Sequence, residues 1–295
     1  MPNSAIDLAG ASASANSEPP SAPSSVTVRI SSGLGNQLFQ FAAGLALARH
    51  RDCGLVLDTS HYGGSAKRQY QLDRFNLPGE VVTHRGRAKG DVPVYREPHF
   101  YFSKTFFDLV PPVRLVGYFL SELYFARVAE EIRRIYTPRF PLSAAAEGSL
   151  RRIAAARHPV SLHIRRGDYA STAVPHLDPL PVDYYRQATS LLGEMIGEEP
   201  TYFVFSDDVA EAAEMTSFLP DRILVEGDVE DPWESLIVMR QCRHHVIANS
   251  TFSWWGAWLS EAADRAVIAP RRWHTDAAAQ SKDTRDLIPD GWRLV

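Results

Sequence analysis

The sequence of 295 residues has few cysteines, no long hydrophobic run and no excess of basic residues. Its two cysteines, Cys53 and Cys242, are too few for a disulfide scaffold or a cysteine-based zinc site, and we expect both to fill core space. The best apolar run, Phe41–Ala48, is far shorter than the ~20 residues that a membrane anchor needs. Lys and Arg total 31 against 35 Asp and Glu, which excludes a general nucleic-acid binder.

Residues 1–25 also lack the parts of a secretory signal. Seven Ser, six Ala and four Pro dominate them, and the first basic residue of the chain is Arg29. Without a basic n-region and an apolar h-region the segment is not a signal peptide, and its composition predicts a disordered tail. We therefore expect a cytoplasmic protein.

The rest of the chain alternates strand-like and helix-like segments, which predicts an α/β fold with parallel sheets. We expect an N-terminal lobe over 26–150, a C-terminal lobe over 151–295, and a ligand cleft between them at the carboxyl ends of the strands. The two halves carry net charges of +3 and −7, so an anion site in the second half has to be local. The expected strands are 26–30, 54–58, 114–118, 160–165, 201–206, 223–225, 245–248 and 265–269, and the expected helices are 122–136, 143–157, 183–196, 208–218, 231–241 and 252–261, with 60–112 irregular.

The segment His163-Ile-Arg-Arg-Gly-Asp-Tyr169 follows a strand. Alternation along that strand predicts that Leu162 and Ile164 face the sheet packing and that His163 and Arg165 face the other way. Arg166 and Asp168 then fall in the loop at the strand's carboxyl end. Two adjacent guanidiniums fit either an ion-pair cluster with Asp168 or a diphosphate clamp, because arginine forks match phosphate oxygens.

A second polar segment, Asn249-Ser-Thr-Phe-Ser-Trp-Trp-Gly-Ala-Trp258, opens a helix. Its Asn, Ser and Thr residues are typical N-caps, and its tryptophans are candidates for the core. The same helix start also offers an anion site, with the hydroxyls of Ser250, Thr251 and Ser253 at hand.

Three further patterns are less specific. In Ser206-Asp-Asp208, either Ser206 caps a helix and the carboxylates of Asp207 and Asp208 favour its positive end, or these carboxylates bind a base or ribose. Gly33-Leu-Gly-Asn-Gln-Leu38 begins like a dinucleotide fingerprint, but Leu38 breaks it, which weakens an NAD-dependent reductase. The alternative is a close backbone approach to a ligand, with Asn36 and Gln37 as polar contacts. The pair His244 and His245 fits strand-edge residues better than metal ligands, and no metal site is predicted.

Taken together, these segments resemble glycosyltransferase family 11, the α-1,2-fucosyltransferases, and especially its bacterial members. The resemblance spans about 28–293 in family order. It rests on Gly33–Gln40, Gly117–Glu122, His163–Tyr169, Phe205–Asp208, Gln241–His244, Ala248–Leu259 and Asp286–Trp292.

The resemblance implies a GT-B-like fold of two Rossmann-type lobes, with GDP-β-L-fucose as donor bound by the C-terminal lobe. It implies inverting, metal-independent transfer to the 2-hydroxyl of a galactose-type acceptor on the N-terminal side, with no cofactor. Arg165 and Arg166 would bind the pyrophosphate, and Asp168 and His163 would order the loop or touch the nucleotide. The general base is not identified, and Glu122 and Asp168 are the candidates.

Two departures from the family bear on acceptor choice. Ser235 stands where many members have Asp, and the loop 170–180 follows the family only loosely. A related enzyme that uses another GDP-sugar, and a non-catalytic GDP-sugar or glycan-binding module, stay open as alternatives. The net charge of the first half also suggests loose association with an anionic membrane that carries lipid-linked acceptors.

Overall fold

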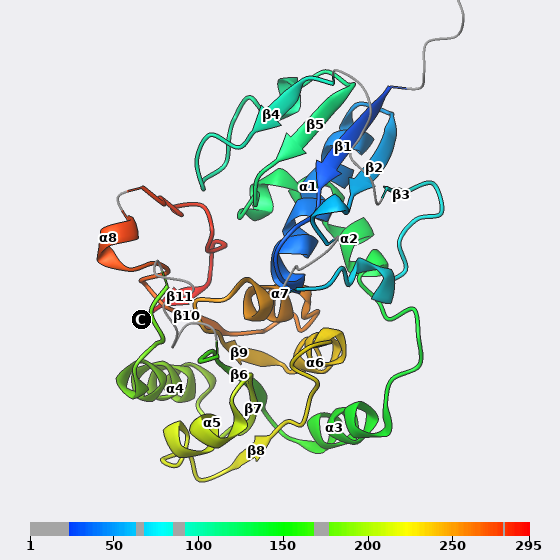
Figure 1. Cartoon of the computed structure of the whole chain (residues 1–295). Helices are drawn as coiled ribbons and strands as arrows, with labels where there is room; N and C mark the ends of the chain where they lie inside the picture. Colours follow the sequence, from blue (N-terminus) through cyan, green and yellow to red (C-terminus); the bar gives the residue numbers. More distant parts are fainter. Residues whose placement is uncertain (1–23, 63–67, 85–91, 168–176, 280) are drawn as a thin grey trace, which may run out of the picture.

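The computed structural model describes residues 24–62, 68–84, 92–167, 177–279 and 281–295, and these residues contain two β-sheets (Figure 1). Most of the predicted tail, residues 1–23, lies outside them. The first sheet has the order β3-β2-β1-β5-β4 and the second has the order β11-β10-β9-β6-β7-β8. Each strand pairs in parallel with its neighbours. The predicted α/β fold with two Rossmann-type lobes is confirmed.

Strands and helices alternate along the chain in the second lobe, whereas in the first lobe the described residues contain no α-helix between β2 and β5. The strands are β1 Ser25–Arg29, β2 Gly54–Asp58, β3 Val82–His84, β4 Val94–Arg96, β5 Val113–Val116, β6 Pro159–Ile164, β7 Thr201–Ser206, β8 Arg222–Leu224, β9 His244–Val246, β10 Val267–Ala269 and β11 Arg293–Leu294. The helices are α1 Leu34–His50, α2 Ala129–Ile135, α3 Ala144–Ala155, α4 Val182–Ile196, α5 Val209–Met215, α6 Trp233–Met239, α7 Thr251–Leu259 and α8 Asp276–Ala279.

The predicted division of faces along β6 is confirmed. All of β6 is buried, as expected of a central strand in a parallel sheet covered on both faces. Leu162 and Ile164 pack in one apolar cluster with Tyr184 and Tyr185 of α4. His163 lies on the other side, toward the first lobe.

Some local predictions were wrong. The helix expected over 122–136 is two short 3-10 turns, Glu122–Tyr124 and Ala126–Val128, followed by α2 alone. The turns place Phe125 among the tryptophans of α7, which a straight helix would not do. The region 60–112 is not wholly irregular, because it contains β3 and β4. These strands are too short to show alternation in sequence, and their pairing with β2 and β5 defines them.

The histidine pair in β9 is not at a sheet edge, because β9 lies between β6 and β10. His245 Nδ1 is 2.7 Å from Ser161 Oγ, and His244 Nδ1 accepts a 3.1 Å hydrogen bond from the Ala266 N–H. Burial is the main cause that lowers the pKa of His245 to about 3, so this ring stays neutral. These contacts fix neighbouring strands to one another.

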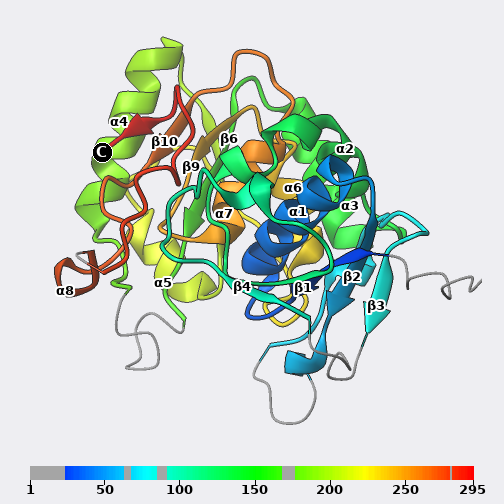
Figure 2. The ribbon, with the colours of Figure 1, turned by 90° about the horizontal axis from the view of Figure 1, so that it is seen from above.

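The two lobes share one apolar core around α1 and α7, which lie side by side at the junction (Figures 1 and 2). The ring of Trp255 in α7 stacks on Phe125 at a centroid distance of 5.2 Å, and Phe39 of α1 lies 4.9 Å from it. The Trp255 Nε1–H also donates to the Gly35 carbonyl at 3.0 Å. A single hydrophobic cluster therefore runs from β1 and α1 into α6 and α7. An interface of this kind limits rigid-body movement between lobes.

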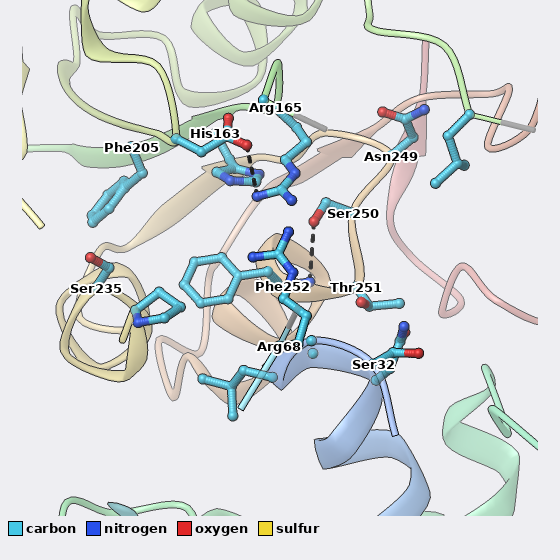
Figure 3. A pocket seen from close by; sticks show the side chains of 18 of the residues that line it. Ser32, Arg68, His163, Arg165, Phe205, Ser235, Asn249, Ser250, Thr251 and Phe252 are labelled. Atoms are coloured by element: carbon cyan, nitrogen blue, oxygen red, sulfur yellow. Dashed lines mark hydrogen bonds and ion pairs between the residues drawn. The ribbon is translucent and has the colours of Figure 1, made fainter. Parts of the chain in front are cut away.

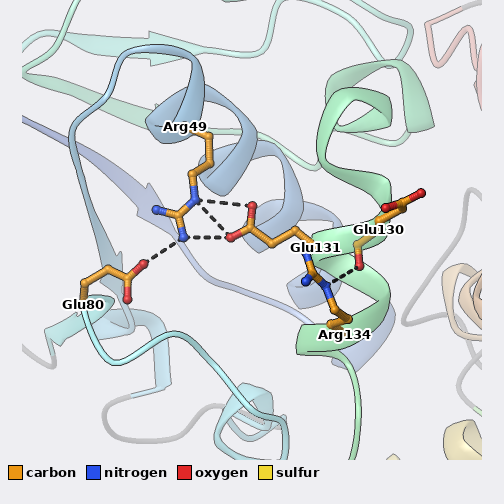
Figure 4. Close-up of polar contacts among 5 residues, drawn as sticks. All are labelled: Arg49, Glu80, Glu130, Glu131 and Arg134. Atoms are coloured by element: carbon orange, nitrogen blue, oxygen red, sulfur yellow. Dashed lines mark hydrogen bonds and ion pairs between the residues drawn. The ribbon is translucent and has the colours of Figure 1, made fainter.

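An exposed ion-pair network lies at the C-terminal end of α1 (Figure 4). Arg49 Nη2 lies 2.7 Å from the Glu131 carboxylate and 2.8 Å from that of Glu80. A cation in the last turn of a helix is favourable because of the helix dipole. Accessible pairs contribute only about 0–1 kcal/mol each, so this network fastens α2 to α1 without deciding the fold.

Candidate functional site

A cavity of about 780 Å³ lies between the lobes, at the carboxyl ends of strands from both sheets (Figure 3). Ligands of open α/β sheets bind at such a place. The start of α1 forms one wall, and the ends of β6 and β7 with the start of α7 form another. Of the predicted site residues, the structure brings together Asn36, His163, Arg165, Asp207, Asn249, Ser250 and Thr251 on the lining.

Asp207 holds the loop that carries Arg165. Its Oδ2 lies 2.9 Å from Arg165 Nη1, and its Oδ1 accepts a 2.9 Å hydrogen bond from the Arg166 backbone N–H. A Cβ at Gly167 would meet the same carboxylate, so a larger residue there would have to displace the Asp207 side chain. The Arg165 side chain is 18% exposed and still lines the cavity. Its guanidinium is therefore fixed in direction before any ligand arrives.

His163 lies behind Arg165 and packs against the ring of Phe252 at a centroid distance of 5.7 Å. Burial first, and then the charge of Arg165, lower the pKa of His163 to about 3. The ring is therefore neutral near pH 7 and adds no positive charge to the cavity. A base this weak is also poorly matched to removing a proton from a hydroxyl.

The start of α7 has the predicted cap. Ser250 is the N-cap, and its Oγ accepts a hydrogen bond from the Phe252 N–H at 3.4 Å. Asn249 donates from Nδ2 to the carbonyls of Asp178 at 3.0 Å and Trp273 at 3.2 Å, which ties the cap to two cavity-lining loops. The N-terminus of α7 thus points at the cavity, where its dipole favours an anion.

The start of α1 meets the start of α7. A Cβ at Gly35 would lie 2.5 Å from Thr251 Oγ1 and 2.6 Å from the Phe252 nitrogen, so only glycine allows this approach. Gly33, the N-cap of α1, has no side-chain capping bond. Two helix N-termini, one from each lobe, therefore border the same cavity as Arg165.

Two predicted residues of the first lobe do not line the cavity. Gln37 is fully buried, and both ends of its amide bond the backbone: Nε2 donates to the Gln69 carbonyl at 2.8 Å and Oε1 accepts from the Gln71 N–H at 2.9 Å. Glu122 accepts a 2.8 Å hydrogen bond from Trp258 Nε1 at the lobe junction. Neither side chain is placed to touch a ligand in the cavity.

Three predicted residues of the second lobe also lie off the lining. The Arg166 side chain pairs with Glu211. Asp208 caps α5, since its Oδ1 accepts a 3.0 Å hydrogen bond from the Glu211 N–H. Ser253 is buried and donates to the Ser250 carbonyl at 3.2 Å. Asp168, with most of the loop 170–180, lies outside the described residues.

The structure adds cavity residues that sequence reasoning missed. Arg68 reaches the cavity from the first lobe, and Phe100 and Tyr118 form an aromatic wall with parallel rings 6.2 Å apart. His274 and Lys282 join this wall from the C-terminal segment. Tyr118 lies in Gly117–Glu122, one of the segments that carry the family resemblance, but that segment gave no indication of ligand contact. The other positions lie in loops without a local pattern, and for Arg68 and Phe100 the aromatic and proline richness of 60–112 was the signal at hand.

The described residues contain neither a candidate metal site nor a candidate membrane-spanning helix. No group of three or more His, Cys, Asp or Glu there has the arrangement of a metal site. None of the helices in that part of the chain has the length and apolar character to cross a membrane.

The family model described as Glycosyl transferase family 11 matches residues 98–293. The O-antigen biosynthesis glycosyltransferase WbnK of Escherichia coli is 31% identical over 89% of this chain and 98% of its own. The alpha-1,2-colitosyltransferase of Escherichia coli is 30% identical over 90% of this chain and 97% of its own. Human galactoside alpha-(1,2)-fucosyltransferase 1 is 27% identical over 85% of this chain and 69% of its own.

Among solved structures, a variant of Arabidopsis thaliana FUT1 in complex with GDP superposes with a TM-score of 0.52. The match covers 88% of this chain and 73% of that chain at 14% identity. At this identity the likeness concerns the fold alone, which is that of the two-lobed GT-B-like enzymes.

Proposed function

Because the chain belongs to glycosyltransferase family 11, we propose that it is an inverting, metal-independent fucosyltransferase acting on GDP-β-L-fucose. The acceptor in this proposal is the 2-hydroxyl of a galactose-type sugar. The observation that carries it is the convergence of Arg165 and two helix N-termini on one cavity between the lobes.

The donor diphosphate is assigned to the wall formed by Arg165 and the starts of α7 and α1. Guanidinium forks and helix N-termini both bind phosphate oxygens well. Ser250 and Thr251 add hydroxyls at that wall. An anion fits here despite the net charge of the second half, because Asp207 is already bound to Arg165 and its loop.

The guanosine is assigned to the arm of the cavity in the C-terminal lobe, 151–295. Phe205, Val225 and Gly227 offer apolar surface for the base, and the carboxylates of Asp228 and Glu230 also line this arm. Carboxylates accept hydrogen bonds from the N–H groups on the guanine edge. Ser235, which replaces the Asp of many relatives, contributes only a hydroxyl here.

The acceptor is assigned to the aromatic wall of the N-terminal lobe, 26–150. Phe100, Tyr118 and Leu120 of this lobe line the cavity and offer the flat apolar surface on which the C–H face of a sugar packs. The positive first half would also favour lipid-linked acceptors at an anionic membrane, which liposome flotation tests.

The proposed mechanism follows from charge. The acceptor oxygen attacks the fucosyl C1 on the face opposite the diphosphate, which inverts the configuration. As the C1–O bond breaks, its electron pair passes to the β-phosphate oxygen, and donors aimed there stabilise the transition state most. Arg165 and the two helix N-termini supply this stabilisation. Glu122 does not line the cavity, so Asp168 is the remaining candidate base of the two.

A second candidate donor is GDP-colitose, because a colitosyltransferase is among the close relatives. Colitose is L-fucose without its 3-hydroxyl. A site that hydrogen-bonds a substrate hydroxyl rejects the deoxy analogue by about 10⁴–10⁵, whereas an apolar site barely discriminates. The ratio of kcat/KM for the two donors therefore decides between them.

The test of the proposed function is GDP release from GDP-fucose with a panel of β-galactosides, in EDTA and in Mg²⁺. We expect release with at least one acceptor, equal rates in both buffers, and an α-1,2 linkage in the product by NMR. A thermal-shift panel of GDP-fucose, GDP-mannose and UDP-galactose identifies the donor independently, because a bound ligand stabilises by mass action. No release from GDP-fucose with any acceptor would overturn the proposal.

A further inference from the structure

Arg68 brings a second guanidinium to the cavity, from the lobe opposite Arg165. It lies in the connection between β2 and β3, and its side chain lines the cavity. Figure 3 shows the Arg68 and Arg165 side chains reaching toward one another across the space beside Phe252 and Ser250. The two lobes thus each present one arginine to the same volume.

The segment that carries Arg68 is held in place by Gln37 of α1. The two hydrogen bonds of the Gln37 amide reach the backbone of Gln69 and Gln71, just beyond Arg68, and Nε2 also lies 3.1 Å from the Ser32 carbonyl. Because Gln37 is fully buried, these bonds are shielded from water and fix the chain there. Support of the neighbouring backbone thus explains why the Gln37 amide is buried near the start of α1, and no ligand contact is needed to account for it.

The same segment is fastened to the second lobe. Gln71 Nε2 donates to the Glu230 carbonyl at 2.9 Å, and Arg74 Nη2 lies 2.6 Å from Asp231 Oδ2. Asp231 follows the loop that lines the arm of the cavity assigned to the guanosine. The position of Arg68 is therefore tied to α1 on one side and to that loop on the other.

The two guanidiniums carry like charges, and the ion pair with Asp207 offsets part of the charge of Arg165. The start of α1 and the start of α7 add positive potential at the same place. A ligand that carries negative charge on two neighbouring phosphates is attracted by both arginines. The diphosphate of a sugar nucleotide offers one phosphate to each guanidinium, whereas a monophosphate ester of similar charge has only one phosphate to offer.

We propose that Arg68 is a second ligand of the sugar-nucleotide diphosphate, supplied by the N-terminal lobe, and that Gln37 is its positioning residue. The inference rests on the proposed function for the nature of the ligand. Arg165 binds the diphosphate from the C-terminal lobe and Arg68 closes it from the other side. As the fucosyl C1–O bond breaks, the electron pair left on the β-phosphate oxygen is stabilised by both guanidiniums.

The test compares GDP and GMP binding by isothermal titration calorimetry for wild type, Arg68→Gln and the control Arg152→Gln, a change on the exposed face of α3. Loss of one charge-assisted contact should weaken GDP binding by about 10–100-fold in Arg68→Gln. GMP binding should change less than threefold, and the control should match wild type. Equal GDP affinity in wild type and Arg68→Gln would overturn the inference, whereas a wild type that binds no GDP would overturn the proposed function itself.

The positioning role of Gln37 is tested with Gln37→Met, which keeps the volume and removes all three hydrogen bonds of the amide. We expect the selectivity for GDP over GMP to fall toward that of Arg68→Gln, and the double variant to lose no more than the single ones. Gln71→Met removes the side-chain hydrogen bond to the Glu230 carbonyl and keeps the backbone bond to Gln37, so it tests the fastening of the same segment if Gln37→Met does not fold. Fully additive losses in the double variant would show that Gln37 does not act through Arg68.

Discussion

Both lobes are built on parallel sheets, but they differ in strand order and contribute to the cavity in different ways. The C-terminal lobe delivers side chains from strand ends, with Arg165 after β6 and Asp207 after β7. The N-terminal lobe delivers backbone at the start of α1 and a loop residue, Arg68, that Gln37 holds from a distance. The charged residues of the C-terminal lobe can therefore be predicted from strand–loop patterns in the sequence. The charged residue of the N-terminal lobe is identified only from long-range contacts in the structure.

The lobes also differ in where their packing lies. The helix that borders the proposed phosphate site, α7, belongs by sequence to the second lobe, but its tryptophans pack against α1 and Phe125 of the first. The start of α7 thus borders the cavity, and the tryptophans of the same helix pack in the core that joins the lobes. This arrangement holds the two helix N-termini together, so the phosphate site does not depend on lobe closure to form.

Trp255→Ala should have the largest effect, because it removes the shared core between the lobes. The ring is fully buried, and such truncations cost about 3–5 kcal/mol. We expect urea unfolding to remain one cooperative transition at a much lower midpoint. Trp292→Ala, at the half-buried rim of the same cluster, should lose clearly less. Two separate transitions, one of them unchanged, would show that the lobes fold independently.

Arg165→Gln tests whether the C-terminal lobe dominates catalysis. Removing one preorganised donor to a departing anion should lower kcat about 10²–10³-fold, and the melting temperature should fall as well, because the largely buried Asp207 carboxylate loses its ion-pair partner. Arg186→Gln on α4, whose guanidinium packs over Phe218, is the matched control in the same lobe and should keep full activity. If Arg165→Gln retains more than a third of the wild-type kcat, the C-terminal lobe does not dominate catalysis.

Gly35→Ala probes the contact between the two helix starts. The added methyl group meets Thr251 Oγ1 and the Phe252 backbone, so α1 and α7 have to separate, at a cost of about 1–3 kcal/mol. Gly33→Ala is the control, because its Cβ would meet nothing within 4 Å. Equal stability of the two variants in thermal melts would mean that the helix starts are not pressed together.

Buried titratable groups of the two lobes should contribute to the pH dependence of stability with opposite signs. His163 and His245 of the second sheet have pKa values lowered to about 3, mainly by burial. Since the unfolded chain takes up these protons first, their contribution is complete above about pH 6.5 and is lost as the pH falls toward 3. Glu97 of the first lobe opposes this, because burial raises its pKa to about 7 and its protonated form is favoured on folding.

Between about pH 6.5 and 4.5, Glu97 offsets part of the histidine effect, so the net loss should be about 1 kcal/mol for each pH unit, since one pKa unit corresponds to ~1.4 kcal/mol. Below that range the loss should steepen. Chemical unfolding at a series of pH values measures this, with His61→Gln at an exposed position as the control. A stability that is flat from pH 7 to 5 in both proteins, or that rises toward acid, would contradict the assignment.

The C-terminal lobe was largely predictable, because its strands and helices alternate and the polar residues follow the strands directly. Asn249, Ser250 and Arg165 were found in this way, and each lines the cavity. Gln37 and Glu122 were not placed correctly by pattern, since polarity next to a cleft does not tell whether a side chain faces the ligand or the backbone. Arg68 was missed because its position depends on hydrogen bonds between residues 30 or more apart.

The most direct test of the central claim is a crystal structure of the protein with GDP. We expect the diphosphate to lie between Arg165 and the start of α7, with Arg68 in contact with it from the N-terminal lobe. The base should then lie in the arm lined by Phe205 and Val225. GDP bound elsewhere, for example in the neighbouring hollow of about 560 Å³ whose lining residues lie between Pro270 and Leu294, would contradict it.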